Sequence, residues 1–362
     1  MKLFTLGPVE MYPETLALCG RPLPYFRTQA FSDIVLDCAR RLKRLTGAPA
    51  GSEVFFLTAS GTGAMEAAVA NLFDRDDHLC IVDGGSFGHR FTEICARHGI
   101  PYSALFLPFS AETMAGAAEP GAAEPDEAEP DEERLRRFVR AQARGTGFLI
   151  NLHETSTGRL YDLAPVSELC RERDMLLVVD AISAFLADEL DMAGSGIDVL
   201  ILSTQKALAL PPGMSAVILS PDALRRMNRV RPFSLYFDFK DYAANGARGQ
   251  TPFTPAVGIL MALQQRLLSI EQSGGAAASI RGISALAADF RARARMLPAA
   301  LPRYPLSNAC TPLLFPRGGA AETYRILAQE YDVWLNPNGG EHKDRILRVG
   351  HLGNLTESDN AM

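Results

Sequence analysis

Long apolar runs, closely spaced cysteines and an excess of basic charge are all missing from this chain of 362 residues. No apolar stretch approaches the roughly 20 residues that a membrane helix needs, and the opening segment MKLFTLGP is broken too soon for a signal peptide. The six cysteines form no CxxC pair, which favours reduced thiols and a cytoplasmic protein. The net charge of −6, with scattered Lys and Arg, argues against nucleic acid as a partner. His89 and His98 lack acidic or cysteine neighbours at ligand spacing, so no metal site is expected.

Apolar residues make up 47% of the chain. Their pattern alternates between short runs typical of strands and spacings typical of helices. Apolar runs predict buried strands, and helical patterns separate them. This alternation over residues 53–220 predicts an α/β fold with a mostly parallel sheet covered by helices. After residue 255 the pattern changes to two helical runs, 256–272 and 278–297, followed by short strands around one helix over 306–350. The second pattern predicts a smaller α+β domain.

The predicted domain organisation has three parts. Residues 1–30, interrupted by proline and glycine, predict an extended N-terminal arm that lines the substrate entrance. Residues 31–255 form the expected large domain, and residues 256–362 the expected small C-terminal domain. Within the large domain, the acidic low-complexity segment 115–133 repeats the triplet AEP, and it predicts a mobile surface insertion.

Three local predictions follow from shorter patterns. Residues 31–46 have apolar side chains at helical spacing, with Ser32 as the expected N-cap. The basic cluster at residues 40–44 is interpreted as the solvated face of this helix. Residues 231–255, rich in aromatic side chains and interrupted by Gly and Pro, predict a loop.

An acid and a lysine mark the ends of two consecutive predicted strands. Asp180 ends LLVVD, and Lys206 follows VLILS, 26 residues further on. In parallel α/β sheets, ligands bind outside the carboxyl ends of the strands. The cofactor pyridoxal 5′-phosphate (PLP) needs a lysine to form a Schiff base with its aldehyde and a carboxylate to keep its ring nitrogen protonated. The apolar stretch after Lys206 favours the neutral, nucleophilic amine. The alternative is a lysine at a helix start that reaches solvent.

Other turns after strands supply what else PLP requires. Residues 60–63, Ser-Gly-Thr-Gly, open a helix whose free N–H groups suit a phosphate, although a plain tight turn is equally consistent. Phe87, on a Gly-flanked loop, could stack on a planar ring or simply cover the core. The sequence HETSTG at 153–158 places hydroxyl and acid groups at another strand end. His153 as a general base is the less favoured interpretation of that segment.

The order of these strand-end residues along the chain resembles that of the class V aminotransferases of fold type I. The resemblance covers nearly the whole chain and is strongest to alanine–glyoxylate and serine–pyruvate aminotransferases. Its most specific element is SxxKALxxPPG, matched by residues 203–213. The resemblance implies that Lys206 is the Schiff-base lysine and the proton-transfer base, and that Asp180 is the partner of the pyridinium nitrogen. It also implies that Arg348, in LRVGHLG, clamps the substrate carboxylate. The implied cofactor contacts are Ser60, Gly61, Thr62, Gly63, Phe87, Thr155, Asp180, Gln205 and Lys206, with Thr251 and Thr254 reaching the phosphate of the neighbouring subunit in a homodimer.

The reaction implied by the resemblance is the ping-pong transfer of an amino group from a small amino acid, of the alanine or serine type, to glyoxylate or pyruvate. A 2-aminoethylphosphonate–pyruvate aminotransferase is the alternative, because VDAISAF resembles that group. A cysteine desulfurase needs a histidine next to its lysine, where Gln205 stands. A non-catalytic protein of this fold would be expected to lose Lys206 or Asp180. Two departures from the family are Leu152, where members usually have His, and a last helix that members carry beyond the position of Met362.

Overall fold

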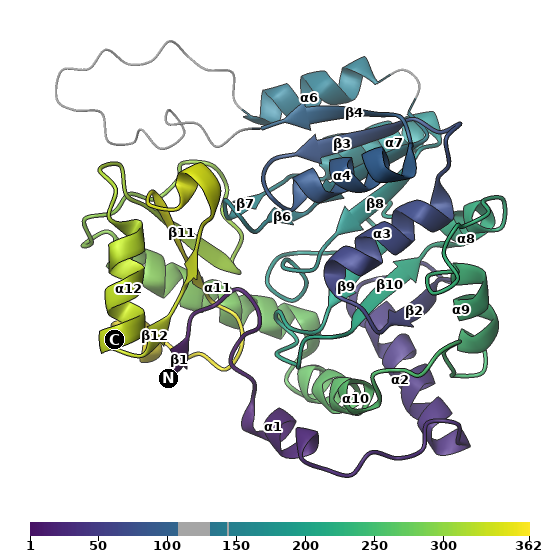
Figure 1. Ribbon diagram of the computed structural model, residues 1–362, viewed down its shortest axis with the longest axis horizontal. Helices are drawn as coiled ribbons and strands as arrows, with labels where there is room; N and C mark the ends of the chain where they lie inside the picture. The colour runs from purple at the N-terminus through teal and green to yellow at the C-terminus, as the bar shows by residue number, and fades with distance from the viewer. Residues whose placement is uncertain (108–130, 143–144) are drawn as a thin grey trace.

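The structure is a computed structural model that describes residues 1–107, 131–142 and 145–362. Most of the acidic segment that is predicted to be a mobile insertion lies outside the described residues. Two sheets dominate the rest, a seven-stranded sheet in the larger part of the molecule and a three-stranded sheet beside it (Figure 1). In the ranges that the structure describes, no helix is long and apolar enough to cross a membrane.

The seven-stranded sheet confirms the predicted α/β architecture. Its strand order is β2-β10-β9-β8-β5-β3-β4. Strand β10 runs antiparallel to both of its neighbours, and the other neighbouring pairs in this sheet are parallel. The strands are β2 (Glu53–Leu57), β3 (Leu79–Asp83), β4 (Tyr102–Phe106), β5 (Gly147–Asn151), β8 (Leu176–Asp180), β9 (Val199–Ser203) and β10 (Ser215–Leu219).

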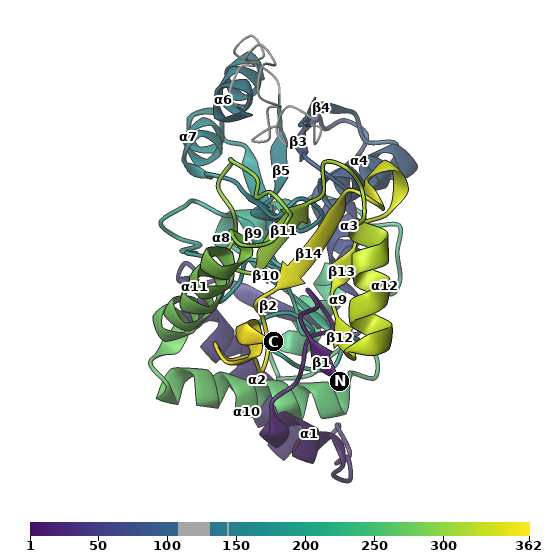
Figure 2. The ribbon, with the colours of Figure 1, turned by 90° about the vertical axis from the view of Figure 1, so that its left-hand side faces the viewer.

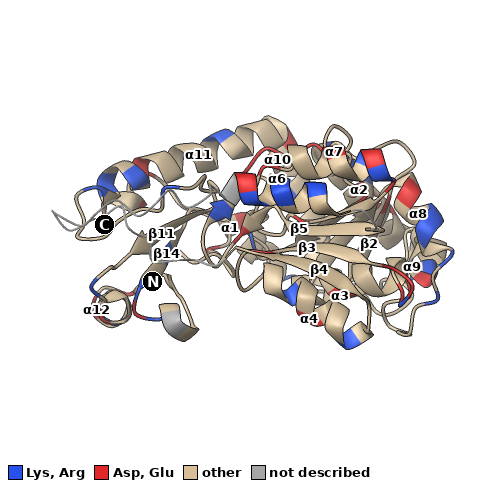
Figure 3. Ribbon diagram, turned by 90° about the horizontal axis from the view of Figure 1, so that it is seen from above, with Lys and Arg blue, Asp and Glu red and all other residues tan. Residues whose placement is uncertain are grey.

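Helices cover both faces of this sheet (Figure 3). Successive side chains of a strand point to opposite faces, so Val54 and Phe56 join one apolar core while Phe55 and Leu57 join the other. The first core is covered by α2 (Gln29–Leu45), α6 (Asp131–Ala141), α7 (Ala164–Arg173) and α10 (Val257–Gln272). The second is covered by α3 (Gly61–Leu72), α4 (Gly88–His98), α8 (Pro221–Met227) and α9 (Phe239–Gly246).

The smaller sheet is antiparallel and contains β11 (Cys310–Leu314), β14 (Ile346–Gly350) and β13 (Asn336–Pro337). It shares a core with α11 (Gly275–Ala294) and α12 (Ala320–Glu330). The first strand of the chain, β1 (Lys2–Leu3), pairs in parallel with β12 (Val333–Trp334). The N-terminus therefore lies beside the smaller sheet, and the C-terminus lies in the same part of the molecule (Figures 1 and 2). A hairpin of two short strands, β6 (His153–Glu154) and β7 (Arg159–Leu160), follows β5.

Three local predictions were wrong. Helix α1 (Pro13–Cys19) lies in the arm that is predicted to be extended, with Pro13 at the first helical position, where its missing N–H is not needed. Helix α2 begins at Gln29 because Thr28, rather than Ser32, is its N-cap and accepts a hydrogen bond from the N–H of Phe31. Helix α9 lies inside the segment predicted as a loop, where Asp238 caps its first turn.

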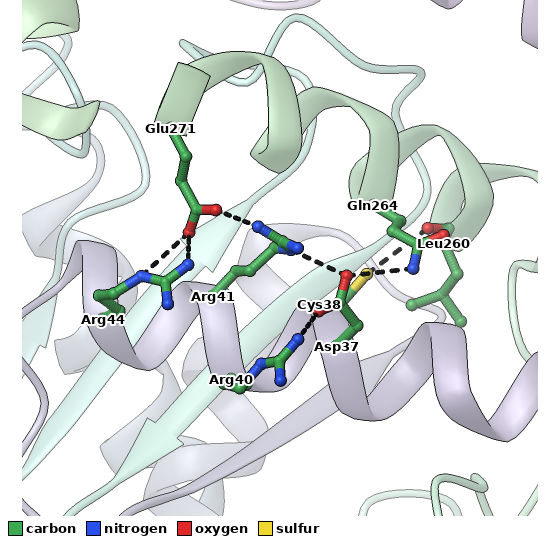
Figure 4. A network of polar contacts seen from close by, with 8 residues as sticks. All are labelled: Asp37, Cys38, Arg40, Arg41, Arg44, Leu260, Gln264 and Glu271. Atoms are coloured by element: carbon green, nitrogen blue, oxygen red, sulfur yellow. Dashed lines mark hydrogen bonds and ion pairs between the residues drawn. The ribbon is translucent and has the colours of Figure 1, made fainter. Parts of the chain in front are cut away.

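The basic cluster at 40–44 does more than face solvent (Figure 4). Arg41 and Arg44 both form ion pairs with Glu271 at the end of α10, and Arg41 Nε lies 2.8 Å from Asp37. The side chain of Arg41 is only 13% exposed, whereas that of Arg40 is 68% exposed. Burial raises the pKa of Asp37, but hydrogen bonds from Arg41 and Gln264 outweigh it and lower the pKa to about 2. The cluster therefore joins α2 to α10.

Candidate active site

The two residues at the centre of the sequence prediction lie at one edge of the larger sheet. Strands β8 and β9 are adjacent and parallel, with Asp180 in register with Ile201, so both strands end at the same edge. Lys206 is 9% exposed and Asp180 is 6% exposed. Within the described part of the chain, Lys206 Nζ has no hydrogen bond, and Asp180 accepts one, from the N–H of Ile182 at 2.8 Å.

Burial controls the charge of both side chains. It lowers the pKa of Lys206 to about 8, although the nearby Asp180 carboxylate opposes the shift. It raises the pKa of Asp180 to about 6, although the hydrogen bond from Ile182 opposes that shift. Lys206 therefore reaches its neutral, nucleophilic form much closer to neutral pH than a lysine in solvent does.

The predicted phosphate turn is the N-terminus of α3. Ser60 is the N-cap, and its side chain makes no capping hydrogen bond, so the hydroxyl is available to a ligand. Gly61 packs against Ile182, and a Cβ at this glycine would lie 2.3 Å from Ile182 Cδ1. This close approach places the turn of Ser60, Gly61, Thr62 and Gly63 beside the segment that follows Asp180. The free N–H groups of the first helical turn can bind an anion there.

Glu154, which the sequence analysis left without a role, anchors the loop that carries Phe87. Its buried carboxylate accepts hydrogen bonds from the N–H groups of Gly88 at 2.8 Å and Phe87 at 3.3 Å. It also accepts from the side-chain amide of Asn151 and from the N–H of Ser156. In the sequence, the sign of a role for Glu154 is its place directly before small hydroxyl residues at a strand end. The contacts show that this acid positions the loop.

We expect Glu154→Gln to destabilise the protein and weaken cofactor binding. A glutamine side chain keeps one acceptor oxygen and adds a donor, so at least one of the N–H groups now bound by Glu154 loses its partner. Such a loss costs about 1–3 kcal/mol in the free energy of unfolding. Chemical denaturation measures it, with Glu93→Gln, an exposed glutamate on α4, as the matched control. An unchanged denaturation midpoint would contradict the anchoring role.

Arg348 reaches the site from β14 of the smaller sheet. Its Nη1 donates to the carbonyl of Thr155 at 2.8 Å, and its Nη2 donates to the carbonyl of Pro337 at 3.1 Å. Its buried Nε has no hydrogen-bond partner among the described residues. The Thr155 hydroxyl pairs with the hydroxyl of Ser183 at 2.8 Å. Thr155 therefore links the strand ends of the larger sheet to the predicted carboxylate clamp.

Gly7 of the N-terminal arm touches Lys206, a contact that the sequence analysis missed. A Cβ at Gly7 would lie 2.8 Å from Lys206 Cδ and 3.0 Å from the carbonyl oxygen of Gln205. Its φ of +139° also favours glycine. The Gln205 side chain accepts a hydrogen bond from the Ser203 hydroxyl at 2.6 Å. Nothing in the local sequence distinguishes Gly7 from other arm residues, since its role depends on this distant contact.

The predicted phosphate-binding threonines lie on the loop between α9 and α10. Thr251 is buried and donates to the carbonyl of Phe253 at 2.6 Å, and Thr254 is exposed. Arg27 of the arm donates to the carbonyl of Thr251 at 3.2 Å. In the described chain, none of these bonds joins the loop to Lys206 or to the start of α3.

His153 is a buried residue beside the site with both ring nitrogens lacking a hydrogen bond to any described residue. Burial, together with the charge of Lys206, lowers the pKa of His153 to about 3. A histidine ring with such a low pKa is a weak base, so it accepts a proton poorly near neutral pH. The low pKa agrees with the sequence analysis, in which a general-base role for His153 is the less favoured interpretation.

The unpartnered polar groups in this part of the described chain fit PLP. They include the buried Lys206 amine, a second oxygen of Asp180 and the Nε of Arg348. The uncapped hydroxyl of Ser60 adds an exposed polar group at the start of α3. Buried polar groups are nearly always hydrogen-bonded, so an unpartnered set indicates a polar ligand. PLP offers an aldehyde to the amine, a protonated ring nitrogen to the acid and a phosphate to the helix N-terminus.

Comparisons with known proteins agree with this chemistry. Residues 126–297 match the family model described as Aminotransferase class-V. The chain is 27% identical to an L-aspartate–glyoxylate aminotransferase of Paracoccus denitrificans, over 98% of this chain and 87% of that protein. It is 32% identical to a 2-aminoethylphosphonate–pyruvate transaminase of Burkholderia thailandensis, over 68% of this chain and 62% of that protein. The structure of a subgroup IV aspartate aminotransferase from Thermus thermophilus aligns with a TM-score of 0.86 at 25% identity, covering 100% and 96% of the two chains.

Proposed function

Because the chain belongs to the class V aminotransferases and has PLP as its cofactor, we propose that it transfers an amino group from a small amino acid, of the alanine or serine type, to a 2-oxo acid such as glyoxylate or pyruvate. The observation that carries the proposal is the burial of Lys206 and Asp180 at the ends of adjacent strands. Arg348 adds a guanidinium with a free Nε at the same place, which suits the carboxylate shared by both substrates.

Each residue of the site has a proposed task. When bound, PLP supplies an electron-withdrawing ring that stabilises negative charge at the Cα of the substrate. Lys206 would hold the cofactor through Nζ, and the Asp180 carboxylate would keep the ring nitrogen protonated. The Lys206 amine, with a pKa of about 8, accepts the proton from the substrate Cα and can release it again near neutral pH. Because both substrates would use the same amine and the same Arg348 clamp, the first product must leave before the second substrate binds, as ping-pong kinetics require. The other proposed cofactor contacts are Ser60, Gly61, Thr62, Gly63, Phe87, Thr155 and Gln205.

Arg348→Lys is expected to raise the KM for both substrates by about 10- to 100-fold, because lysine cannot form the two-pronged pair with a carboxylate. The visible absorbance of the bound cofactor should stay the same, since Arg348 contacts Thr155 only through its backbone carbonyl. Steady-state kinetics and absorbance spectra measure the two effects. Arg345→Lys, at an exposed arginine nearby, is the matched control. Unchanged KM values would mean that another group binds the substrate carboxylate.

A panel of half-reactions tests the choice of substrate. Alanine, serine, aspartate and 2-aminoethylphosphonate are offered as donors to the PLP form, and glyoxylate and pyruvate as acceptors to the aminated form. We expect alanine or serine to be the fastest donor and glyoxylate the fastest acceptor. A clear preference for 2-aminoethylphosphonate would overturn this choice and support the alternative, which the similarity to a 2-aminoethylphosphonate–pyruvate transaminase favours.

We also propose a cytoplasmic homodimer with shared active sites. Large apolar side chains are exposed in two segments, with Tyr25 at 68%, Phe233 at 88% and Leu235 at 78% exposure, and exposed apolar surface of this kind marks interfaces. Thr251 and Thr254 lie on a loop held by Arg27, from which they can serve a second chain. The free thiols of all six cysteines suit the reducing cytoplasm. Sedimentation of the PLP-loaded protein should give twice the mass of one chain, and a monomer would contradict shared sites.

A further inference from the structure

Arg90 connects the two turns that the sequence assigns to the cofactor, yet no role was assigned to it. It lies in the first turn of α4, three residues after Phe87. Its Nη1 donates a hydrogen bond to Thr62 Oγ1 at 2.6 Å. Its guanidinium carbon lies 4.5 Å from the centre of the Phe87 ring, in a cation–π contact. One side chain thus holds both the proposed stacking aromatic and the proposed phosphate turn.

The position of Arg90 is electrostatically unfavourable unless an anion is bound. Thr62 lies in the first turn of α3, and the N-terminal end of a helix carries partial positive charge that repels a cation. In the described residues, no carboxylate forms an ion pair with Arg90. Two other partly buried arginines of this chain do have one, since Arg226 pairs with Asp77 and Arg41 pairs with Asp37. Arg90 and the start of α3 thus place positive charge together without an ion-paired carboxylate, which favours an anionic ligand there.

The positive charge of Arg90 also acts on Asp180 and Lys206. Burial dominates the pKa shifts of both Asp180 and Lys206, and the charge of Arg90 adds a lowering contribution to each. Thr62 strengthens the anion site in a second way. Its oxygen accepts the hydrogen bond from Arg90, so its own hydrogen is free, and a hydroxyl that already accepts is a stronger donor.

We propose that Arg90 is a ligand of the cofactor phosphate, acting with the Thr62 hydroxyl and the N–H groups at the start of α3. The inference rests on the proposed cofactor site at residues 60–63. Phosphate is the one strongly anionic group of PLP, and a planar guanidinium that also stacks on Phe87 binds it with a fixed orientation. Arg90 therefore selects for the phosphorylated form of the cofactor.

The test compares the affinities of the cofactor-free full chain for PLP and for pyridoxal, which lacks the phosphate. A phosphate ligand should affect only the affinity for PLP. We expect Arg90→Gln to weaken PLP binding by about 10- to 100-fold and pyridoxal binding by less than about threefold, because a charge-assisted hydrogen bond to the phosphate is lost. Arg90→Lys keeps the charge and should retain most of the preference for PLP. Arg97→Gln removes the same charge from an exposed site two turns along α4 and should change neither affinity.

Inorganic phosphate gives a readout that needs no cofactor. It should raise the melting temperature of the wild-type apoprotein and compete with PLP, and both effects should be lost in Arg90→Gln. An equal loss of PLP and pyridoxal affinity would overturn the proposal, because Arg90 would then act only through the ring of Phe87. If Arg90→Gln does not fold, Thr62→Val must show the same phosphate-selective loss. A wild type that binds no PLP would refute the proposed function itself, whereas normal PLP binding by Arg90→Gln refutes this assignment alone.

Discussion

Replacing Lys206 with alanine is expected to abolish amino transfer while the protein still folds. The amine makes no hydrogen bond to any described residue, so its removal leaves no donor or acceptor of the fold without a partner. Turnover should fall by at least about 10³-fold, because both the covalent attachment of PLP and the base for the substrate proton are lost. Mixing the variant with PLP should give no visible absorbance of a lysine-bound cofactor and no borohydride-stable label.

The controls for this variant separate chemistry from folding. Lys343→Ala, at an exposed lysine near the smaller sheet, should bind and turn over like the wild type. Circular dichroism should show unchanged helix and strand content in Lys206→Ala. If borohydride still fixes PLP to the protein in Lys206→Ala, the cofactor is attached elsewhere and the assignment of this lysine is wrong.

Asp180→Asn is the second change with a large expected effect. Asparagine has nearly the same shape and can still accept the hydrogen bond from the N–H of Ile182, so the strand end should keep its structure. It lacks the negative charge that holds a proton on the ring nitrogen of PLP. Removing one such buried electrostatic contact should lower kcat by about 10²- to 10³-fold.

The same substitution should shift the titration of Lys206 in a defined direction. Burial lowers the pKa of Lys206 to about 8, and the charge of Asp180 works against that shift. Without that charge, the pKa should fall further, so the apoenzyme should react with an aldehyde at lower pH than the wild type does. Asp180→Glu keeps the charge and is the matched control. A kcat within tenfold of the wild type, or a Lys206 pKa that rises, would contradict the role of Asp180.

Part of this site could be predicted because its signals are local. A short apolar run that ends in an acid predicts both a buried strand and the position of Asp180 at its carboxyl end, and the same reasoning applies to Lys206 after β9. The turn at Ser60 lies directly between a strand and a helix, so its geometry follows from the sequence order. Arg348 was identified only through the resemblance, because the sequence alone does not show that β14 brings it to Thr155.

The residues that sequence reasoning missed act through contacts between distant segments. Glu154 matters because the loop at Phe87 donates to it, and Arg90 matters because it meets Thr62 on another helix. Their neighbours in sequence do not reveal either contact. Helix α1 was missed for a different reason, since the prolines that argue for an extended chain include one at a helix start, where proline is favoured.

The pairing of the first strand with one near the end of the chain has a consequence for how the protein is made. Leu6 donates to the side chain of Asn336, 330 residues away, and β1 pairs with β12 in the same region. Chains emerge from the ribosome N-terminus first, at about 5–20 residues per second. Strand β1 is therefore synthesised well before β12 and stays unpaired until β12 has followed. Because Gly7 packs on Lys206 just beyond this pairing, the wall of the lysine site is among the last features to form.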